Sequence, residues 1–414
     1  MAAVLKTYAG LDRSIYFLFL AQVVNSIGHF VHPFLTLLLT QKLGMDPGEA
    51  GFYVFLSALA WVPGSLAGGK VADSFGRKKA MVLFHTLPAL ALIPCAFLGA
   101  SRLVAWLLIA ASFLHGLAEP VNDAMLTDLT TPEQRKPAFS LLYLGHNIGI
   151  SVGPLFAGVL FNRYLTLFFL ADAGTTLAAV VLIALFVRES APTREQIEAS
   201  FRKDSSSERA EKGSLLAVLL RRPFLLAFLF ISALMSLVYS QSLFSLPLQC
   251  SALFGERGPR TFGLLASLNG LTVITLTTVV LHFTRRLAPV LTVAVSGLFY
   301  AAGFGLIGRV GSLPWLLLST LIWTVGEILA ATSTGAYIAG HSPLTHRGRI
   351  NAIAPIIMYS GFAAGPALAG NLAERFSLAV IWPWTFILSL AAALLLALLY
   401  WRERASTGSS RTAA

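Results

Sequence analysis

The chain has 414 residues, of which 56% are hydrophobic and 12% charged, and its formal net charge is +11. So much apolar surface excludes an ordinary soluble domain and favours a chain that lies in lipid. The basic residues form short clusters between apolar runs, so they indicate membrane topology and no nucleic-acid partner. Two cysteines, Cys95 and Cys250, cannot define a disulfide framework.

Apolar runs long enough to cross a membrane recur along almost the whole chain. The first, 14–40, is too long for the core of a signal peptide and no small-residue cleavage site follows it, so we predict a retained first helix. We predict an all-α membrane protein with twelve transmembrane helices in two pseudo-symmetric six-helix bundles. The helices are expected to begin near residues 14, 50, 80, 103, 137, 165, 223, 261, 288, 313, 350 and 378.

The distribution of Lys and Arg predicts the orientation. With the N-terminus in the cytoplasm, the inner segments hold most of the 30 Lys and Arg residues, which satisfies the positive-inside rule. We therefore expect a multi-pass protein of the bacterial inner membrane, with both termini cytoplasmic, membrane lipids around it and a monomeric state.

A polar, charge-rich segment separates the first six helices from the last six. The predicted domains are an N-terminal bundle (1–187), a cytoplasmic linker (188–222), a C-terminal bundle (223–400) and a cytoplasmic tail (401–414).

The two halves repeat a motif. The run from Gly149 to Gly158 in the fifth helix recurs from Gly361 to Gly370 in the eleventh, with the same Gly-Pro step. Such parallel halves are typical of alternating-access carriers, so we expect a substrate site between them near the bilayer midplane.

The first helix carries a polar stripe. Gln22, Asn25, His29 and His32 are spaced three or four residues apart, which places them on one face. His29 and His32 with His115 could bind a metal ion, but no cysteine or carboxylate completes a known ligand spacing. We therefore predict that the stripe lines the transport pathway, with no metal site and no cofactor.

After the second helix the sequence reads Gly69-Lys-Val-Ala-Asp73-Ser-Phe-Gly76-Arg77-Lys-Lys. Gly76 permits a tight turn, and Asp73 can place its carboxylate at a helix N-terminus. The segment resembles the signature loop of the major facilitator superfamily, Gly-x-x-x-Asp-x-x-Gly-Arg-Arg/Lys. The resemblance implies that fold and a cytoplasmic latch in which Asp73 caps the eleventh helix and Arg77 reaches Asp128.

The fifth-helix run contains Gly149, Gly153, Pro154 and Gly158. It resembles a second signature, Gly-x-x-x-Gly-Pro-x-x-Gly-Gly, which in this superfamily is associated with exporters, chiefly drug:proton antiporters; Ala157 replaces one of its glycines. Small residues allow close helix contact and the proline gives a bend point. Because the eleventh helix carries nearly the same pattern, a packing seam is the alternative, and the direction of transport depends on this resemblance alone.

Ionisable residues within a membrane helix usually face a cavity. In the fourth helix His115, Glu119 and Asp123 are spaced i, i+4 and i+8 along one face. We predict a proton relay with Glu119 as the preferred acid, followed by His115. The alternative is that Glu119 is a neutral packing acid.

In the tenth helix Glu327 roughly mirrors Glu119. Two buried acids on opposite halves can exchange protons as a cavity changes sides, and a cationic substrate can compete for them. The alternative for Glu327 is a bond to backbone at a broken helix. Asp172, in the sixth helix, is a weaker candidate.

Further polar and aromatic side chains are expected to contact substrate. These are Tyr143, His146 and Asn147 of the fifth helix and Tyr239 and Gln241 of the seventh. Phenylalanine is abundant, with 29 residues, and an aromatic cavity suits lipophilic cations.

ATP-binding and hydrolase motifs are absent from the sequence, so we predict that the chain is not an enzyme. The predicted function is secondary active transport, with proton-coupled efflux of small lipophilic or cationic compounds by alternating access. A proton-coupled importer, a lipid or lysolipid translocator, and a non-transporting membrane sensor remain alternatives.

Overall fold

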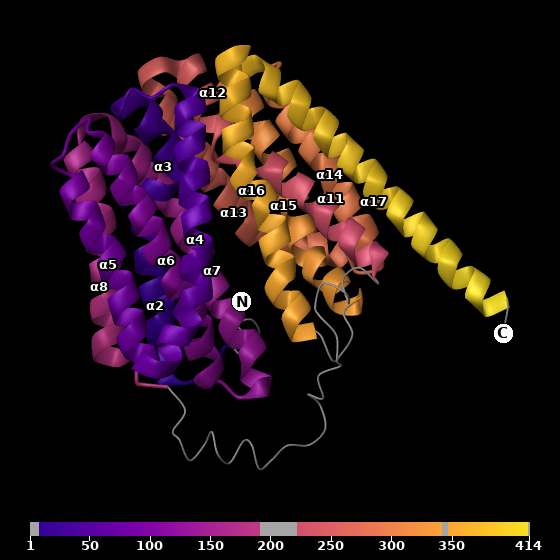
Figure 1. The fold of residues 1–414 in the computed structure, drawn as a ribbon, viewed down its shortest axis with the longest axis horizontal. Coiled ribbons are helices and arrows are strands. Elements are labelled where there is room, and N and C mark those ends of the chain that lie inside the picture. Colours follow the sequence, from indigo (N-terminus) through magenta and orange to yellow (C-terminus); the bar gives the residue numbers. More distant parts are fainter. Residues whose placement is uncertain (1–7, 191–221, 342–346, 413–414) are drawn as a thin grey trace. The chain divides into compact units, whose positions relative to one another are not determined.

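The computed structural model describes residues 8–190, 222–341 and 347–412, and within them the chain forms helices and no strands (Figure 1). The predicted linker lies almost entirely outside these residues. The helices of the N-terminal half are α2 (Arg13–Gly28), α3 (Val31–Leu37), the π-helix η1 (Leu38–Lys42), α4 (Pro47–Phe75), α5 (Arg77–Cys95), α6 (Arg102–Asp128), α7 (Pro132–Arg163) and α8 (Leu165–Phe186). Those of the C-terminal half are α11 (Pro223–Tyr239), η2 (Ser240–Ser242), α12 (Ser245–Phe254), η3 (Gly255–Arg257), α13 (Gly258–Thr284), α14 (Pro289–Ile307), α15 (Leu313–His341), α16 (Arg347–Arg375), η4 (Leu378–Val380) and α17 (Ile381–Thr412).

Eleven stretches of the described chain are long and apolar enough to cross a membrane. One of them, Pro223–Thr284, has 62 residues, and as a single helix it would be roughly 90 Å long, about three times the hydrocarbon thickness. It contains a reversal instead, because Gly255 has a positive φ of 53° and a Cβ at Gly258 would lie 2.5 Å from the Cα of Ser251. The stretch therefore holds two spans, α11–α12 and α13, and the predicted twelve-helix all-α membrane fold is confirmed.

The described residues fall into two compact units. Unit 1 takes in the described part of Met1–Lys203 together with Pro247–Ile274, so it contains α2 to α8, most of α12 and the first part of α13. Unit 2 takes in the described parts of Asp204–Leu246 and Thr275–Ala414, which include α11 and α14 to α17. The domain boundaries expected from the sequence stay a prediction.

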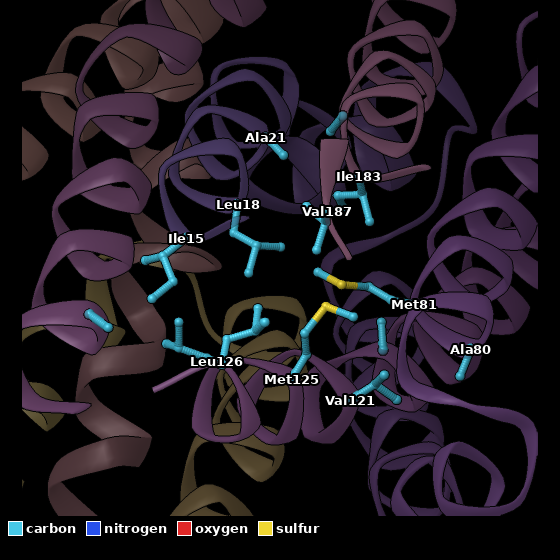
Figure 2. Close-up of a cluster of buried hydrophobic side chains, with 14 of the residues drawn as sticks. Ile15, Leu18, Ala21, Ala80, Met81, Val121, Met125, Leu126, Ile183 and Val187 are labelled. Atoms are coloured by element: carbon cyan, nitrogen blue, oxygen red, sulfur yellow. The ribbon is translucent and has the colours of Figure 1, made fainter. Parts of the chain in front are cut away.

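The interior of unit 1 is apolar near the start of α5. Side chains from α2, α5, α6 and α8 meet there, among them Ile15, Met81, Met125 and Ile183 (Figure 2). These four are between 0% and 6% exposed, so dispersion contacts hold the helices together. His85, one helical turn after Met81, is also buried, and its Nδ1 lies 2.9 Å from the carbonyl oxygen of Met81. The apolar cluster is therefore bordered by a polar side chain.

The repeated glycine runs occupy equivalent places in the two units. A Cβ at Gly149 of α7 would lie 2.2 Å from the Cβ of Ser26 in α2. A Cβ at Gly361 of α16 would lie 1.8 Å from the carbonyl oxygen of Ala233 in α11. Both glycines are therefore needed for close contact with the first helix of their own half.

The rest of the fifth-helix run faces two neighbours within unit 1. A Cβ at Gly153 would lie 2.5 Å from a backbone carbonyl oxygen of α2. On another side, a Cβ at Gly158 would lie 2.7 Å from the Pro259 carbonyl oxygen, and one at Gly263 would lie 2.2 Å from that of Pro154. The run is thus a two-sided packing seam against α2 and α13, and its export-specific meaning stays a prediction.

Candidate functional site

The first membrane span is broken in the middle of its polar stripe. Helix α2 ends at Gly28 and α3 begins at Val31, so the first backbone N–H groups of α3 have no partner within the helix. Asp172 of α8 supplies one: its Oδ2 accepts hydrogen bonds from the N–H groups of Phe30 and Val31, both 2.9 Å long. Its side chain is 4% exposed, so this acid caps the break from inside the unit.

Helix α8 holds the break on its other side as well. The hydroxyl of Thr176 donates to Oδ1 of Asn25 at 2.9 Å, one turn before the break. A Cβ at Gly28 would lie 1.7 Å from Oγ1 of Thr175, so only glycine fits there. The backbone on both sides of His29 is therefore fixed by α8.

Four imidazole rings follow one another at this break. The ring centroids of His29 and His32 are 5.5 Å apart, and those of His29 and His115 are 5.8 Å apart. His85 of α5 is buried and its ring lies 6.5 Å from that of His115. The structure thus brings together histidines that the sequence places on the first and fourth helices, and it adds His85, which was not predicted from the sequence.

Metal binding has no geometric support here. Among the described residues, no group of three or more His, Cys, Asp or Glu side chains is arranged to hold a metal ion. Neutral imidazole is both a donor and an acceptor, so these rings remain suited to binding and passing protons.

The predicted cavity residues of α7 divide into two kinds. Nδ1 of His146 lies 3.3 Å from Oγ of Ser26 and 3.4 Å from Nε2 of Gln22, so it joins the stripe of the first helix. Asn147 is buried and donates from Nδ2 to the carbonyl of Tyr143 at 2.8 Å, within its own helix. The Tyr143 side chain is exposed. His146 and Tyr143 therefore present groups for contact, whereas the Asn147 amide donates to α7 itself.

The acids of α6 continue the face that carries His115. Glu119 and Asp123 are exposed, and they lie close enough for the charge of Asp123 to act on Glu119. Because His115 on the same face contacts His29 and His85, this face of α6 points toward α2 and α5. The predicted relay residues therefore form one stripe that begins at the imidazole rings.

The signature loop brings Arg77 and Asp128 together. Nε of Arg77 lies 3.1 Å from Oδ2 of Asp128, and Gly76 turns the chain with a φ of 95°. The environment of Gly69 and the side chain of Asp73 lie outside the described part, so the predicted capping role of Asp73 stays a prediction.

A second acid, not predicted from the sequence, lies beside this loop. The carboxylate of Glu189, just after α8, accepts a bond from the N–H of Lys78 at 3.2 Å and so caps the start of α5. Its position next to Arg188 after an apolar run was the only available signal.

Unit 2 contains a small cavity between α11, α14, α15 and α16. Its volume is about 90 Å³. The rings of Tyr239 and Tyr300 stack across it with centroids 6.0 Å apart. The other lining residues are Ser232, Met235, Ser236, Val293, Ala330, Thr334 and Met358.

An acid lies near this cavity, as do two buried polar atoms that lack a hydrogen-bond partner in the described part of the chain. Glu327 is not itself a lining residue, but it precedes the lining residues Ala330 and Thr334 on the same face of α15 and is close enough for its charge to act on Tyr300. The buried Oγ of Ser232 and Nε1 of Trp323 have no hydrogen-bond partner among the described residues. A ligand or water with matching groups would satisfy them.

Gln241 has a different environment. It is 1% exposed, and its Nε2 lies 3.2 Å from the carbonyl oxygen of Leu237 and 3.1 Å from Oγ of Ser240. Its Oε1 accepts from Ser245 at 2.6 Å. The amide therefore bridges the break between α11 and α12, while Tyr239, two residues earlier, reaches the cavity.

Comparison with known proteins identifies the family. The family model described as Major Facilitator Superfamily matches residues 18–332 and 254–414. The chain is 26% identical over 322 residues to the uncharacterized MFS-type transporter YqjV of Bacillus subtilis strain 168, covering 74% of this chain and 73% of that protein. It is 23% identical to a Na(+), Li(+), K(+)/H(+) antiporter of Planococcus maritimus, covering 80% and 83%. A shorter match, 29% identical over 42% of this chain and 43% of the relative, is to multidrug resistance protein MdtH of Photorhabdus laumondii.

Solved structures share the fold at low identity. A POT family transporter in complex with a thioalcohol-conjugated peptide superposes with a TM-score of 0.78 at 14% identity, covering 96% of this chain and 99% of that one. The human organic anion transporter MFSD10 gives a TM-score of 0.63 at 18% identity, covering 93% and 99%. The chain therefore belongs to the Major Facilitator Superfamily, as its signature loop predicts, and is a multi-pass membrane transporter and not an enzyme.

Proposed function

We propose that this transporter exports small lipophilic or cationic compounds in exchange for protons, by alternating access. The observation that carries the proposal is the aromatic cavity of unit 2, with Glu327 close enough to its Tyr300 for the two to interact electrostatically. A carboxylate beside aromatic rings attracts an organic cation through charge and cation–π contact. The cavity therefore favours a ligand with an apolar body and a positive charge.

The stripe of unit 1 supplies the proton side of the exchange. Glu119 and Asp123 are exposed on the face of α6 that carries His115, and ionisable groups inside a membrane span usually serve such a purpose. A carboxyl group keeps its proton in apolar surroundings and releases it into a wet cavity. Alternate wetting of the two faces would then move protons against substrate.

Two further observations support export. The fifth-helix run resembles the antiporter signature, and two relatives carry the names of a cation/proton antiporter and a multidrug resistance protein. With both termini in the cytoplasm, the Arg77–Asp128 contact lies at the cytoplasmic side and would stabilise closure there.

The test is the sign of proton movement in proteoliposomes. Tetraphenylphosphonium added on one side of vesicles containing the pure protein should drive protons the opposite way, as read by a pH-sensitive dye inside. The double variant Glu119→Gln/Glu327→Gln is the inactive control. Protons moving in the same direction as the cation would instead identify an importer.

Failure to move protons with any compound, together with ligand binding, would identify a sensor. Flux of fluorescent lysolipid without proton movement would identify a lipid translocator. Either result would overturn proton-coupled export.

A further inference from the structure

The break in the first helix gathers titratable groups from five elements of unit 1. His29, just before α3, and His32, within it, meet His115 of α6, which in turn meets His85 of α5. The other titratable groups at this place are His146 of α7, Glu119 of α6 and Asp172 of α8.

The two nearby acids, Asp172 and Glu119, differ in burial and in hydrogen bonding. Asp172 is buried, and two backbone N–H groups occupy its Oδ2. Glu119 lies one helical turn from His115 on the same face and is exposed. Glu119 is therefore the acid positioned to exchange a proton with the rings.

Like-charge repulsion limits what the rings can hold. Neighbouring imidazolium groups 5 to 6 Å apart repel each other, so the cluster favours a single proton over several. An imidazole that takes a proton on one nitrogen can release one from the other nitrogen, and it then returns to a neutral tautomer. A row of such rings can thus transfer one proton with no net change in the charge of any ring, while each ring passes to its other neutral tautomer.

We propose that His29, His32 and His115 form the binding site of the coupled proton and pass it to Glu119, with Asp172 as the positioning residue. This inference rests on the proposed function. Asp172 acts by capping α3, which keeps His29 and His32 beside His115. His85 is buried, and its Nδ1 lies against the Met81 carbonyl. It is therefore the last histidine of the row, next to the apolar cluster.

The first experiment separates proton coupling from substrate movement. In proteoliposomes, tetraphenylphosphonium-driven proton flux is measured beside tetraphenylphosphonium exchange at equal pH, which needs no net proton transfer. His29→Gln and His115→Gln should each lower the proton flux by about tenfold or more, while exchange persists. His282→Gln, an exposed histidine of α13, is the matched control and should leave both unchanged.

Full proton flux in both histidine variants would overturn the proposal. Loss of flux and exchange together would overturn it too if the variant elutes and melts like the wild type, because the rings would then serve substrate binding. The His115 side chain is exposed, so His115→Gln keeps the test decisive should His29→Gln fail to fold.

A second readout needs no transported substrate, so it stands even if the proposed function fails. Nitrogen NMR of the full chain with labelled histidine follows each ring through a pH titration. His29→Gln should shift the titration midpoint of His115, because the rings share one proton. An unchanged His115 midpoint would show that the rings are independent and would overturn the cluster.

The role of Asp172 is tested by a conservative pair. Asp172→Asn keeps an oxygen that can accept from the start of α3, whereas Asp172→Ala removes it. Proton flux should be several-fold higher in Asp172→Asn than in Asp172→Ala, and only Asp172→Ala should uncouple the His29 and His115 titrations. Equal loss in both variants would mean that Asp172 acts as a titrating acid, contrary to the positioning role.

Discussion

The two units share a packing plan but differ in what their interiors hold. In each, a glycine run lies against the backbone or Cβ of the first helix of that half. Unit 1 surrounds its broken helix with histidines and carboxylates, whereas unit 2 lines a small cavity with tyrosine and methionine and has one acid close to Tyr300. The two units thus share a helix packing, but the interior side chains of unit 1 suit proton binding and those of unit 2 suit an apolar cation.

The largest expected effect, on proton flux, comes from replacing Glu119 in unit 1 or Glu327 in unit 2. Glu119→Gln and Glu327→Gln should each lower substrate-driven proton flux by about 100-fold, because each removes a proton-carrying group. Only Glu327→Gln should also abolish tetraphenylphosphonium binding, measured by calorimetry, since the cavity loses its negative charge. Glu374→Gln, exposed near the end of α16, is the control. Equal tetraphenylphosphonium binding by Glu119→Gln and Glu327→Gln would contradict the assignment of the cation site to unit 2.

Much of this comparison could be predicted from local sequence patterns. Twelve spans follow from the length of the apolar runs, and the equivalence of the halves follows from the Gly149 and Gly361 runs. The stripe of His115, Glu119 and Asp123 follows from helical periodicity alone. These features are encoded within single helices, so no tertiary information is needed.

The remaining features depend on contacts between helices. Asp172 caps a break whose only sequence sign is a proline two residues after Val31, and nothing in the sequence links that break to α8. Tyr300 and Ser232 line a cavity that exists only because several helices converge, and Trp323 contacts Tyr239 beside it. Each of them looks like an ordinary residue of an apolar helix when it is considered alone.

The shared packing plan should show the next largest effect. Gly149→Ala and Gly361→Ala place a methyl group where space is already occupied by α2 and α11, so each should lower stability by about 1–3 kcal/mol. Thermal unfolding in detergent measures the change. Gly335→Ala, with open space around its Cα, should be neutral or slightly stabilising because alanine favours the helix. A neutral result at either seam would show that the two halves do not pack alike.

A smaller effect is expected from the aromatic lining. Tyr239→Ala and Tyr300→Ala remove the stacked rings of the unit 2 cavity and should weaken tetraphenylphosphonium binding by about tenfold each, the size of one good cation–π contact. Tyr164→Ala, an exposed tyrosine before α8, is the matched control. Unchanged affinity in both cavity variants would place the cation elsewhere.

The smallest expected effect on stability concerns an ion pair between two helices in each unit. Arg77 pairs with Asp128 in unit 1, while in unit 2 His341 of α15 bonds to Glu403 of α17, and Arg222 donates to the His341 carbonyl at 2.7 Å. Arginine keeps its charge, but histidine is charged only when protonated.

Replacing the acid of each pair compares the two contacts. Asp128→Asn and Glu403→Gln should each lower the free energy of unfolding by up to about 1 kcal/mol, the usual size of a partly exposed ion pair. Thermal unfolding of both variants in detergent measures the change. An unchanged stability of Glu403→Gln beside a loss in Asp128→Asn would mean that the His341–Glu403 contact does not hold α15 to α17, and the two units would then differ in these contacts.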